Sequence, residues 1–326
     1  MTVPPGIFDS YDAKGNREDL ADIIFNVSPT ETPFQMMAMR GRTTNRLHDW
    51  QADGLALAAL NKQLEGDDAV GNVLTATQRL QNFTMISTKV VVISGTQEVV
   101  DKAGRKSELA YQLAKAGKEL KRDMEVGLTR NQDGVAADSP RVLWPLETWY
   151  GTLQGVAGIA PPAQNQFRGA TGVGNALAGL SPDGLLADGT PRALTESLLK
   201  SAIQACWENG GEPGVIMVGA FNKTVISAFT GNSTRFDQGE DKRLVTAIDI
   251  YVSDFGSHRI VPNRFSRKET AHVLTMHLWS VDYLRAFKQI PLAITGDNMR
   301  RQLICEYTLK ACNESGSAVV ADLTFA

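Results

Sequence analysis

Four histidines are the side chains best suited to acid–base or metal chemistry, and their spacing argues against both. His272 and His277 are five residues apart, so a strand would place them on opposite faces, and no acidic residue accompanies them at metal-site spacing. We interpret both as hydrogen-bonded structural histidines. His258 with Asp254 is the one nearby pair that an enzyme with an unrecognised site could use.

The cysteines and serines lack the partners that nucleophiles need. The chain has three cysteines, Cys206, Cys305 and Cys312, an odd number that is too small for a disulfide framework. Cys206 lies on an expected amphipathic helix, where core packing explains it better than reactivity. The sequence contains no G-x-S-x-G motif for a serine nucleophile. We therefore expect the cysteines to be small buried residues in a reducing compartment.

Two glycine-rich stretches approach nucleotide-binding motifs, and each lacks a required residue. Gly172-Val173-Gly174 would need a third glycine where Leu177 stands, so the dinucleotide fingerprint is absent. Residues 219–224 resemble the end of a phosphate loop, but Asn222 replaces the glycine before the lysine. Neither stretch predicts a bound nucleotide.

A short acidic cluster, Glu65, Asp67 and Asp68, could in principle bind a cation. It lacks the alternating ligands of a calcium loop, so a solvated tip is the better interpretation. Together with the incomplete motifs, this indicates a protein that is not an enzyme and that holds neither a cofactor nor a metal.

Composition limits the class of protein. The 326 residues are 43% hydrophobic and 21% charged, which is typical of a globular protein with a real core. A formal net charge of −3 argues against a protein built to grip nucleic acid. No apolar stretch approaches the roughly 20 residues that span a bilayer, and the N-terminus lacks the pattern of a secretory signal.

The longest regular pattern is a helix expected over 107–130. Its apolar residues recur at steps of three and four and form one stripe: Leu109, Leu113, Ala116, Leu120, Met124 and Leu128. Ser107 can cap the helix, and Lys115–Glu119 and Lys121–Glu125 are expected as ion pairs on its solvated side. The local excess of lysine and arginine could contact nucleic acid, but the interleaved acidic residues favour salt bridges.

Two segments are expected to project from the body. Residues 1–45 have too few apolar residues for a core, and only one short helix, over 17–26, fits there. The two prolines of Ser28–Phe34 favour an extended backbone. Residues 46–87 have strand-like ends around a small-residue, acidic tip, which predicts a long hairpin. Because such a hairpin buries little surface alone, it needs a neighbouring molecule to lie on.

Residues 131–195 differ from the rest in composition. They hold ten of the 29 glycines and six of the 13 prolines, so we expect an irregular insertion or linker. Trp144, Trp149 and Tyr150 are expected to pin it to the body, because large aromatic side chains are seldom fully exposed.

The remaining pattern predicts an α+β unit. We expect helices over 195–209 and 221–229, and strands over 215–218, 247–253, 259–262 and 272–279. The C-terminal residues are expected to form a long hairpin that turns at 313–316.

These blocks carry a family resemblance that covers most of the chain and is weakest over 131–195. The chain resembles tailed-bacteriophage major capsid proteins of the Hong Kong 97-type fold. The matching segments are G-N-R-E-D-L-A-D-I-I at 15–24, S-P-T-E-T-P-F at 28–34, L-H-D-W-Q at 47–51, Q-L-E-G-D at 63–67, the segment 93–108, K-R-D-M-E at 121–125 and L-I-C-E-Y-T-L-K-A-C-N-E at 303–314.

The resemblance implies an α+β fold with named parts. They are an N-terminal arm (1–45), an extended loop (46–87), a peripheral domain with its spine helix (88–130), the Gly/Pro-rich insertion or linker (131–195), an axial domain (196–290) and a C-terminal return to the peripheral domain (291–326). It also implies pentamers and hexamers of the chain that form an icosahedral head around double-stranded DNA. An encapsulin-like shell holding a cargo enzyme is the alternative with the same fold.

The partners and the interface follow from the resemblance. We expect contacts with further copies, with scaffolding, portal and decoration proteins, and with DNA without sequence specificity, but no membrane contact. The protein would be assembled in the host bacterial cytoplasm and reside in the virion. The expected subunit-interface residues are Pro29, Pro33, Phe34, Trp50, Glu65, Asp67, Asp68, Arg105, Lys106, Lys118 and Arg122.

Overall fold

The computed structural model describes most of the chain between Ser28 and Phe325. The described residues are 28–55, 58–68, 71, 74, 76–135, 140–152, 164–171, 177–178, 180–182, 184–229 and 249–325. The helix expected over 17–26 and the glycine pair at 172–174 lie outside them.

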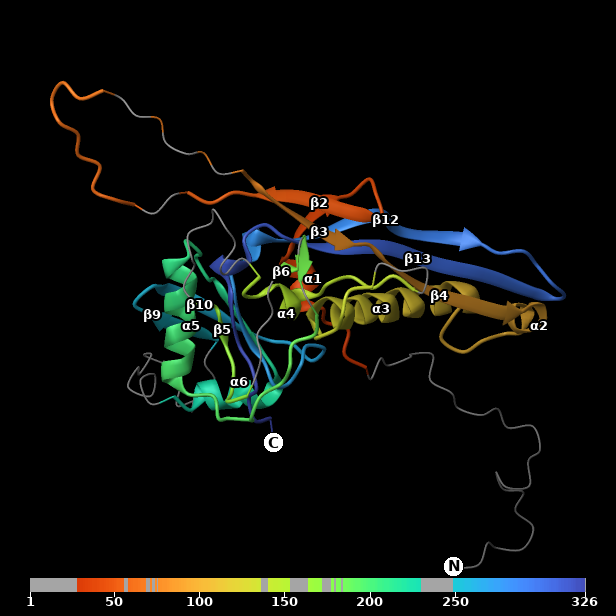
Figure 1. Cartoon of the computed structure of the whole chain (residues 1–326). Coiled ribbons are helices and arrows are strands. Elements are labelled where there is room, and N and C mark those ends of the chain that lie inside the picture. Colours follow the sequence, from red (N-terminus) through yellow and green to blue (C-terminus); the bar gives the residue numbers. More distant parts are fainter. Residues whose placement is uncertain are drawn as a thin grey trace, which may run out of the picture.

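An elongated four-stranded sheet forms one half of the molecule (Figure 1). Its order is β1 (Met39–Arg42), β12 (Trp279–Pro291), β13 (Asn298–Ala311) and β4 (Met85–Ser94). The last three strands are antiparallel, whereas β1 runs parallel to β12. The short helix α2 (Gly95–Val99) follows β4 at the far end of the sheet.

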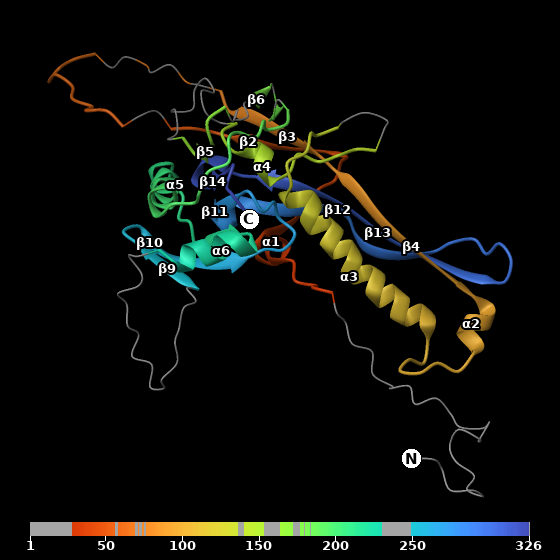
Figure 2. The same cartoon turned by 90° about the horizontal axis from the view of Figure 1, so that it is seen from below.

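The long helix α3 (Glu108–Thr129) lies along one face of this sheet (Figure 2). The predicted helix is confirmed, and the Ser107 hydroxyl accepts a hydrogen bond from the Ala110 N–H at 3.2 Å. Four residues of the predicted stripe are buried, Ala116, Leu120, Met124 and Leu128, while Leu109 and Leu113 nearer the helix start are half-buried. Their contacts with the sheet hold the helix in place.

One predicted ion pair of α3 is wrong. Lys115 and Glu119 do approach each other, at 4.0 Å. The carboxylate of Glu125, however, is buried and accepts hydrogen bonds from other segments instead of facing Lys121 on the solvated side. The i,i+4 spacing could not reveal this, because the three donors to Glu125 come from distant parts of the chain.

A six-stranded sheet forms the other half. Its order is β5 (Gln166–Phe167), β14 (Ala318–Val320), β11 (Ala271–Leu274), β8 (Val215–Val218), β10 (Gly256–Pro262) and β9 (Ile250–Ser253). Helices α5 (Glu196–Glu208) and α6 (Ala220–Ser227) accompany it. The helix expected over 195–209 is confirmed: Thr195 caps it, and Gly210 at φ +76° follows its end.

Two strand predictions near the C-terminus are wrong. The strand expected over 272–279 is split: β11 ends at Leu274, a 3₁₀ turn (Met276–Leu278) follows, and β12 begins at Trp279 in the other sheet. The chain therefore passes from the six-stranded to the four-stranded sheet at 279, and not near 290, where we expected the axial domain to end. The hairpin expected at 313–316 is a 3₁₀ crossover (Glu314–Gly316) between β13 and β14, which lie in different sheets; β13 pairs with β12.

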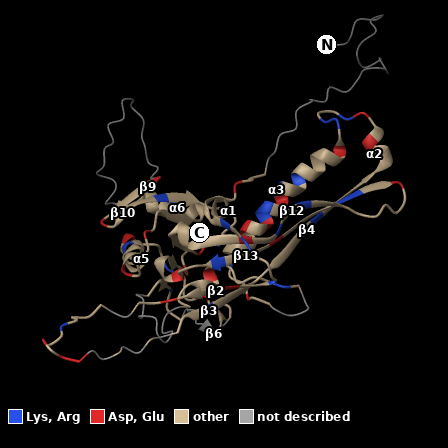
Figure 3. Ribbon diagram, turned by 90° about the horizontal axis from the view of Figure 1, so that it is seen from above, with Lys and Arg blue, Asp and Glu red and all other residues tan. Residues whose placement is uncertain are grey.

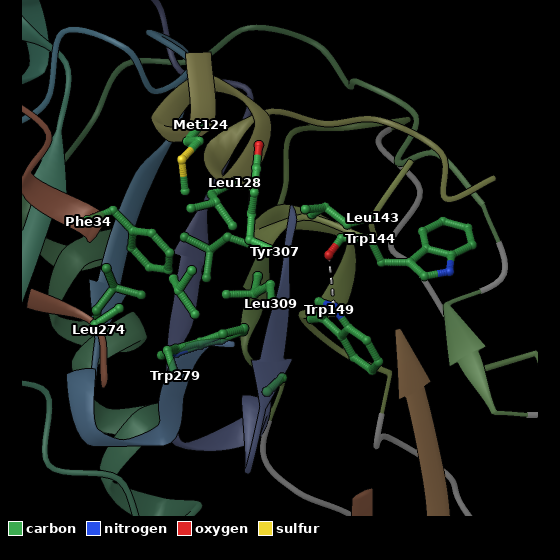
Figure 4. Packing of buried hydrophobic residues seen from close by; sticks show 14 of the residues in the cluster. Phe34, Met124, Leu128, Leu143, Trp144, Trp149, Leu274, Trp279, Tyr307 and Leu309 are labelled. Atoms are coloured by element: carbon green, nitrogen blue, oxygen red, sulfur yellow. Dashed lines mark hydrogen bonds between the residues drawn. The ribbon is translucent and has the colours of Figure 1, made fainter. Parts of the chain in front are cut away.

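The Gly/Pro-rich segment is irregular, as predicted. In its described part it contains only the short elements α4 (Leu146–Trp149), β6 (Leu177–Ala178) and β7 (Ser181–Pro182), besides β5 and isolated bridges. Trp144, Trp149 and Tyr150 are buried, which confirms that they pin the segment to the body. Figure 4 shows Trp144 and Trp149 in the core that α3 and β13 share.

The start of the described chain folds against the body. Helix α1 (Pro33–Met37) begins within the segment 28–34, so its second proline starts a helix where we expected extended backbone. Proline suits this first helical position because its missing N–H would have no helical partner. The hairpin expected over 46–87 is confirmed as β2 (Leu47–Ala52) paired with β3 (Gln78–Phe83), on the face of the sheet opposite α3 (Figure 1).

Candidate assembly interface

The hairpin is anchored at its base by buried side chains. Trp50 and Leu80 belong to the same core cluster as the Gly/Pro-rich segment, and the ring centroids of Trp50 and Trp149 are 5.3 Å apart. The base of the hairpin is therefore part of the body of the subunit.

Asn82 adds a polar lock to this base. Its Nδ2 donates to the carbonyls of Trp144 (3.0 Å) and Leu309 (2.6 Å), and its Oδ1 accepts from the N–H groups of Trp144 (2.9 Å) and Phe83 (2.8 Å). One buried side-chain amide therefore makes hydrogen bonds to the hairpin itself, to the Gly/Pro-rich segment and to β13. These bonds fix the position of the hairpin on the body.

A half-buried His48 also ties the hairpin to the sheet. Its Nε2 lies 2.8 Å from Oδ2 of Asp282 on β12. Burial of the Asp282 carboxyl acts to raise its pKa, but hydrogen bonds from His48 and Ser280 outweigh this and lower the pKa below its ordinary value. Asp282 is thus held as a carboxylate by its neighbours.

The loop beyond the base, residues 53–77, has the opposite character. Its described leucines are 79–91% exposed: Leu55, Leu60, Leu64 and Leu74. The acidic residues of the tip are exposed too, at a turn where Gly66 adopts φ +82°. Burying one leucine is worth about 1.5–3 kcal/mol. The loop therefore leaves the apolar surface of several leucines uncovered in the single subunit.

Strand β4 offers a second unpartnered surface. It is one of the two edge strands of its sheet, and Ile86, Val90 and Val92 on it are each about half exposed. Between β4 and α3 lies a groove of about 640 Å³, with residues 89–94 on one side and Glu108, Gln112 and Glu119 on the other. Long, apolar outer strands are sites where another chain can add.

The predicted interface residues fall into three groups. Exposed ones, free to meet a neighbour, are Glu65, Asp67, Asp68, Lys106 and Lys118. Pro29 and Pro33 are half-buried. Arg105 and Arg122 are half-buried as well and have partners within the chain: Arg105 pairs with Glu108, and Arg122 lies 5.3 Å over the ring of Phe265. Figure 3 shows the charges of both signs along α3.

Two of the predicted interface residues are buried in the single chain, which argues against a contact with another subunit. Phe34 is fully buried and Trp50 is 7% exposed, both within the core of their own chain. Side chains without exposed surface cannot pack against another subunit. Sequence reasoning took them as part of projecting segments, but the bases of these segments belong to the body.

Sequence reasoning also missed the apolar part of the surface. The leucines of the loop stand among polar residues, which was an available signal. The exposure of β4 was not available, because its pattern fits a strand covered on both sides equally well.

The residues considered for catalysis are structural. The two ring nitrogens of His258 bond to the Ser253 hydroxyl and the Pro213 carbonyl, not to Asp254, and burial lowers its pKa. His272 is fully buried beside Tyr150 and Thr270, and burial lowers its pKa to about 3. Cys206 is buried, and its burial raises the thiol pKa.

Two searches concern only the part of the chain that the structure describes. In those residues no three His, Cys, Asp or Glu side chains gather closely enough to hold a metal ion. Likewise, no helix there has the length and apolar character needed to cross a bilayer.

Known proteins resemble this chain over nearly its whole length. The major capsid protein of Escherichia phage Phieco32 is 26% identical over 349 aligned positions, which cover 97% of both chains. A chain of the cyanophage A-1(L) capsid has a TM-score of 0.65 at 14% identity, covering 97% of this chain and 98% of that one. A chain of the holo-SrpI encapsulin complex from Synechococcus elongatus PCC 7942 has a TM-score of 0.53 at 10% identity, covering 95% and 93%.

The fold and the role of a tailed-phage major capsid protein, both expected from the resemblance, are thereby confirmed. The sequence model of the SU10 major capsid protein family matches residues 7–324. The encapsulin shares the fold, but the family match and the sequence relative are phage proteins. The chain belongs to the SU10 major capsid protein family, the structural proteins that form tailed-phage capsids on the Hong Kong 97-type fold.

Proposed function

We propose that copies of this chain form pentamers and hexamers that close into an icosahedral head around double-stranded DNA, joined through the hairpin loop and the arm. The observation that carries this is the contrast within one hairpin: a base locked into the body holds out a loop whose leucines are 79–91% exposed. Because the body fixes the base of the hairpin, a neighbouring subunit that covers the loop would bury its exposed leucines.

The parts named from the family keep their expected roles in this proposal. Residues 1–45 are the N-terminal arm, α3 is the spine helix of the peripheral domain, and the six-stranded sheet is the axial domain. Because β12 lies in the four-stranded sheet, the chain returns to the peripheral domain at 279.

Partners other than the chain itself belong to the same proposal. We infer that the shell is assembled in the host cytoplasm with a separate scaffolding protein and a portal for the genome. Decoration proteins would bind the finished surface. A net charge of −3 suits a container that does not bind DNA tightly, because each phosphate contact adds affinity.

Electron microscopy of the purified chain tests assembly, with and without a candidate scaffold. We expect closed shells, or sheets of pentamers and hexamers, from the wild type and only small species from Leu60→Ser/Leu64→Ser. The matched control is Leu80→Ser at the buried hairpin base, which should lose folding as well as assembly. Normal shells from the Leu60/Leu64 variant would contradict the role of the loop.

The contents of the purified shells distinguish a phage head from the encapsulin-like alternative. Shells made in infected cells that contain DNA support the phage head, whereas shells that retain a co-purifying enzyme and no DNA would contradict it.

A further inference from the structure

The buried carboxylate of Glu125 stands where three parts of the chain meet. Glu125 lies on α3, and its side chain is fully buried. Oε1 accepts from the N–H of Phe34 at 2.8 Å, and Oε2 accepts from the N–H of Gln35 at 3.0 Å. Oε1 also accepts from Nδ2 of Asn263 at 2.8 Å, in the loop that follows β10. The carboxylate thus joins the arm, the spine helix and the six-stranded sheet.

Helix α1 depends on this contact for its own formation. It has only five residues, and its N-cap residue Thr32 makes no side-chain capping bond. A helix this short does not form alone in water. The first N–H groups of a helix have no partner within it, and here Glu125 accepts from those of Phe34 and Gln35. Docking and folding of α1 are therefore one event.

Asn263 is held as firmly from the other side. It is buried, its backbone N–H donates to the carbonyl of Val218 on β8, and its Oδ1 accepts from the N–H of Phe265. Its Nδ2 is directed at Glu125. The position of the six-stranded sheet thus decides whether the third donor reaches the carboxylate.

The chemistry of the junction requires a carboxylate. All three bonds to it come from N–H donors, and only an acceptor with two equivalent oxygens satisfies all of them. Burial raises the pKa of Glu125, while the bonds from Gln35, Phe34 and Asn263 lower it. A buried carboxylate that loses a donor becomes costly, so loss of one bond weakens the support for the others.

We propose that Glu125 couples the docking of α1 to the position of the loop after β10, so that displacement of either one loosens the other. Movement of the axial domain relative to the spine helix would then release the arm from its own subunit. The consequence for shell assembly rests on the proposed function, whereas the coupling itself is a property of the single chain.

Hydrogen exchange measured by mass spectrometry on the full chain tests the coupling. Glu125→Gln turns an amide NH₂ toward the N–H donors, and we expect exchange in the α1 peptide to rise about tenfold or more. Asn263→Ala does not alter any atom of α1, yet we expect about threefold faster exchange there. Glu119→Gln, at a half-buried glutamate of the same helix that pairs with Lys115, is the matched control and should leave α1 unchanged.

The reciprocal experiment keeps the proposal testable if Glu125→Gln fails to fold. Gln35→Ala removes the 2.7 Å bond from Nε2 of Gln35 to the Lys121 carbonyl and keeps the backbone N–H that donates to Glu125. Because coupling is reciprocal, exchange at Phe265 should rise in this variant. Unchanged α1 exchange in Asn263→Ala, or unchanged Phe265 exchange in Gln35→Ala, would overturn the coupling. Failure to form shells with the coupling intact would count against the proposed function alone.

Discussion

The base and the tip of one hairpin are built on opposite principles. At the base, Trp50 is buried against Trp149 and Asn82 has all its bonds within the chain. At the tip, leucines and carboxylates face solvent. The base contributes to the stability of the subunit, whereas the tip leaves its leucines and carboxylates uncovered in the single subunit. Mutations at the two places should therefore separate folding from assembly.

The largest expected effect is at the aromatic base. Trp50→Ala removes a buried indole from the core, and we expect a loss of about 3–5 kcal/mol in the free energy of unfolding. Leu64→Ala at the tip should change it by less than about 0.5 kcal/mol, because its side chain is exposed in the subunit. Urea unfolding of the unassembled chain measures both. Equal losses of unfolding free energy in the two variants would contradict the distinction between a stabilising base and an exposed tip.

Loss of the hydrogen bonds of Asn82 should have the next largest effect on the free energy of unfolding. Asn82→Ala leaves the N–H of Trp144 and two carbonyls without the buried partner that they now have. We expect a loss of about 2–3 kcal/mol. Asn61→Ala in the exposed loop is the matched control and should be neutral within about 0.5 kcal/mol. A neutral Asn82→Ala would mean that the hairpin register does not depend on this residue.

The contact of His48 with Asp282 should give the base a pH dependence. The pKa of Asp282 is lowered from its ordinary value of 3.8, so its stabilisation is fully present above that pH and is lost as the pH falls through the lower folded-state pKa. Asp282→Asn should cost about 1–3 kcal/mol at neutral pH, and its difference from the wild type should shrink below about pH 4. Asp49→Asn, at the more exposed pair with Arg79, should show neither effect.

The smallest effect on the stability of the subunit is expected at the acidic tip. Reversing Glu65, Asp67 and Asp68 to lysine should leave the unfolding free energy within about 0.5 kcal/mol of wild type. If the tip meets a cationic neighbour, the variant should assemble more weakly, and the deficit should shrink as salt screens the charges. Light scattering at several salt concentrations measures this. A deficit independent of salt would show that the tip contacts are not electrostatic.

Local patterns predicted the elements whose signals are continuous in sequence. Helix α3 was found because its apolar stripe and its Ser107 cap lie within one segment. Strand β8 was predicted with its observed bounds. The prediction at 272–279 failed because one apolar run crosses from one sheet to the other, and sequence pattern does not record which sheet a strand joins. The hairpin at 313–316 failed for the same reason.

The exposure of the expected interface residues was predicted only in part. Charged tip residues are recognisable in sequence because isolated acidic residues are rarely buried. Phe34 and Trp50 were misassigned because an aromatic residue in a projecting segment can face a neighbour or its own core, and both choices give the same local pattern. Glu125 was misassigned because its donors lie about 90 and 138 residues away along the chain.

The sequence by itself determined the long helix, the hairpin, the irregular Gly/Pro-rich segment and the membership of the capsid family, since each is written in local spacing, composition or ordered motifs. Only the tertiary structure decided which ends of these segments are buried, which sheet each C-terminal strand joins, and where Glu125 finds its donors. These depend on contacts between residues far apart in the chain, and such contacts leave no periodic trace in a single sequence.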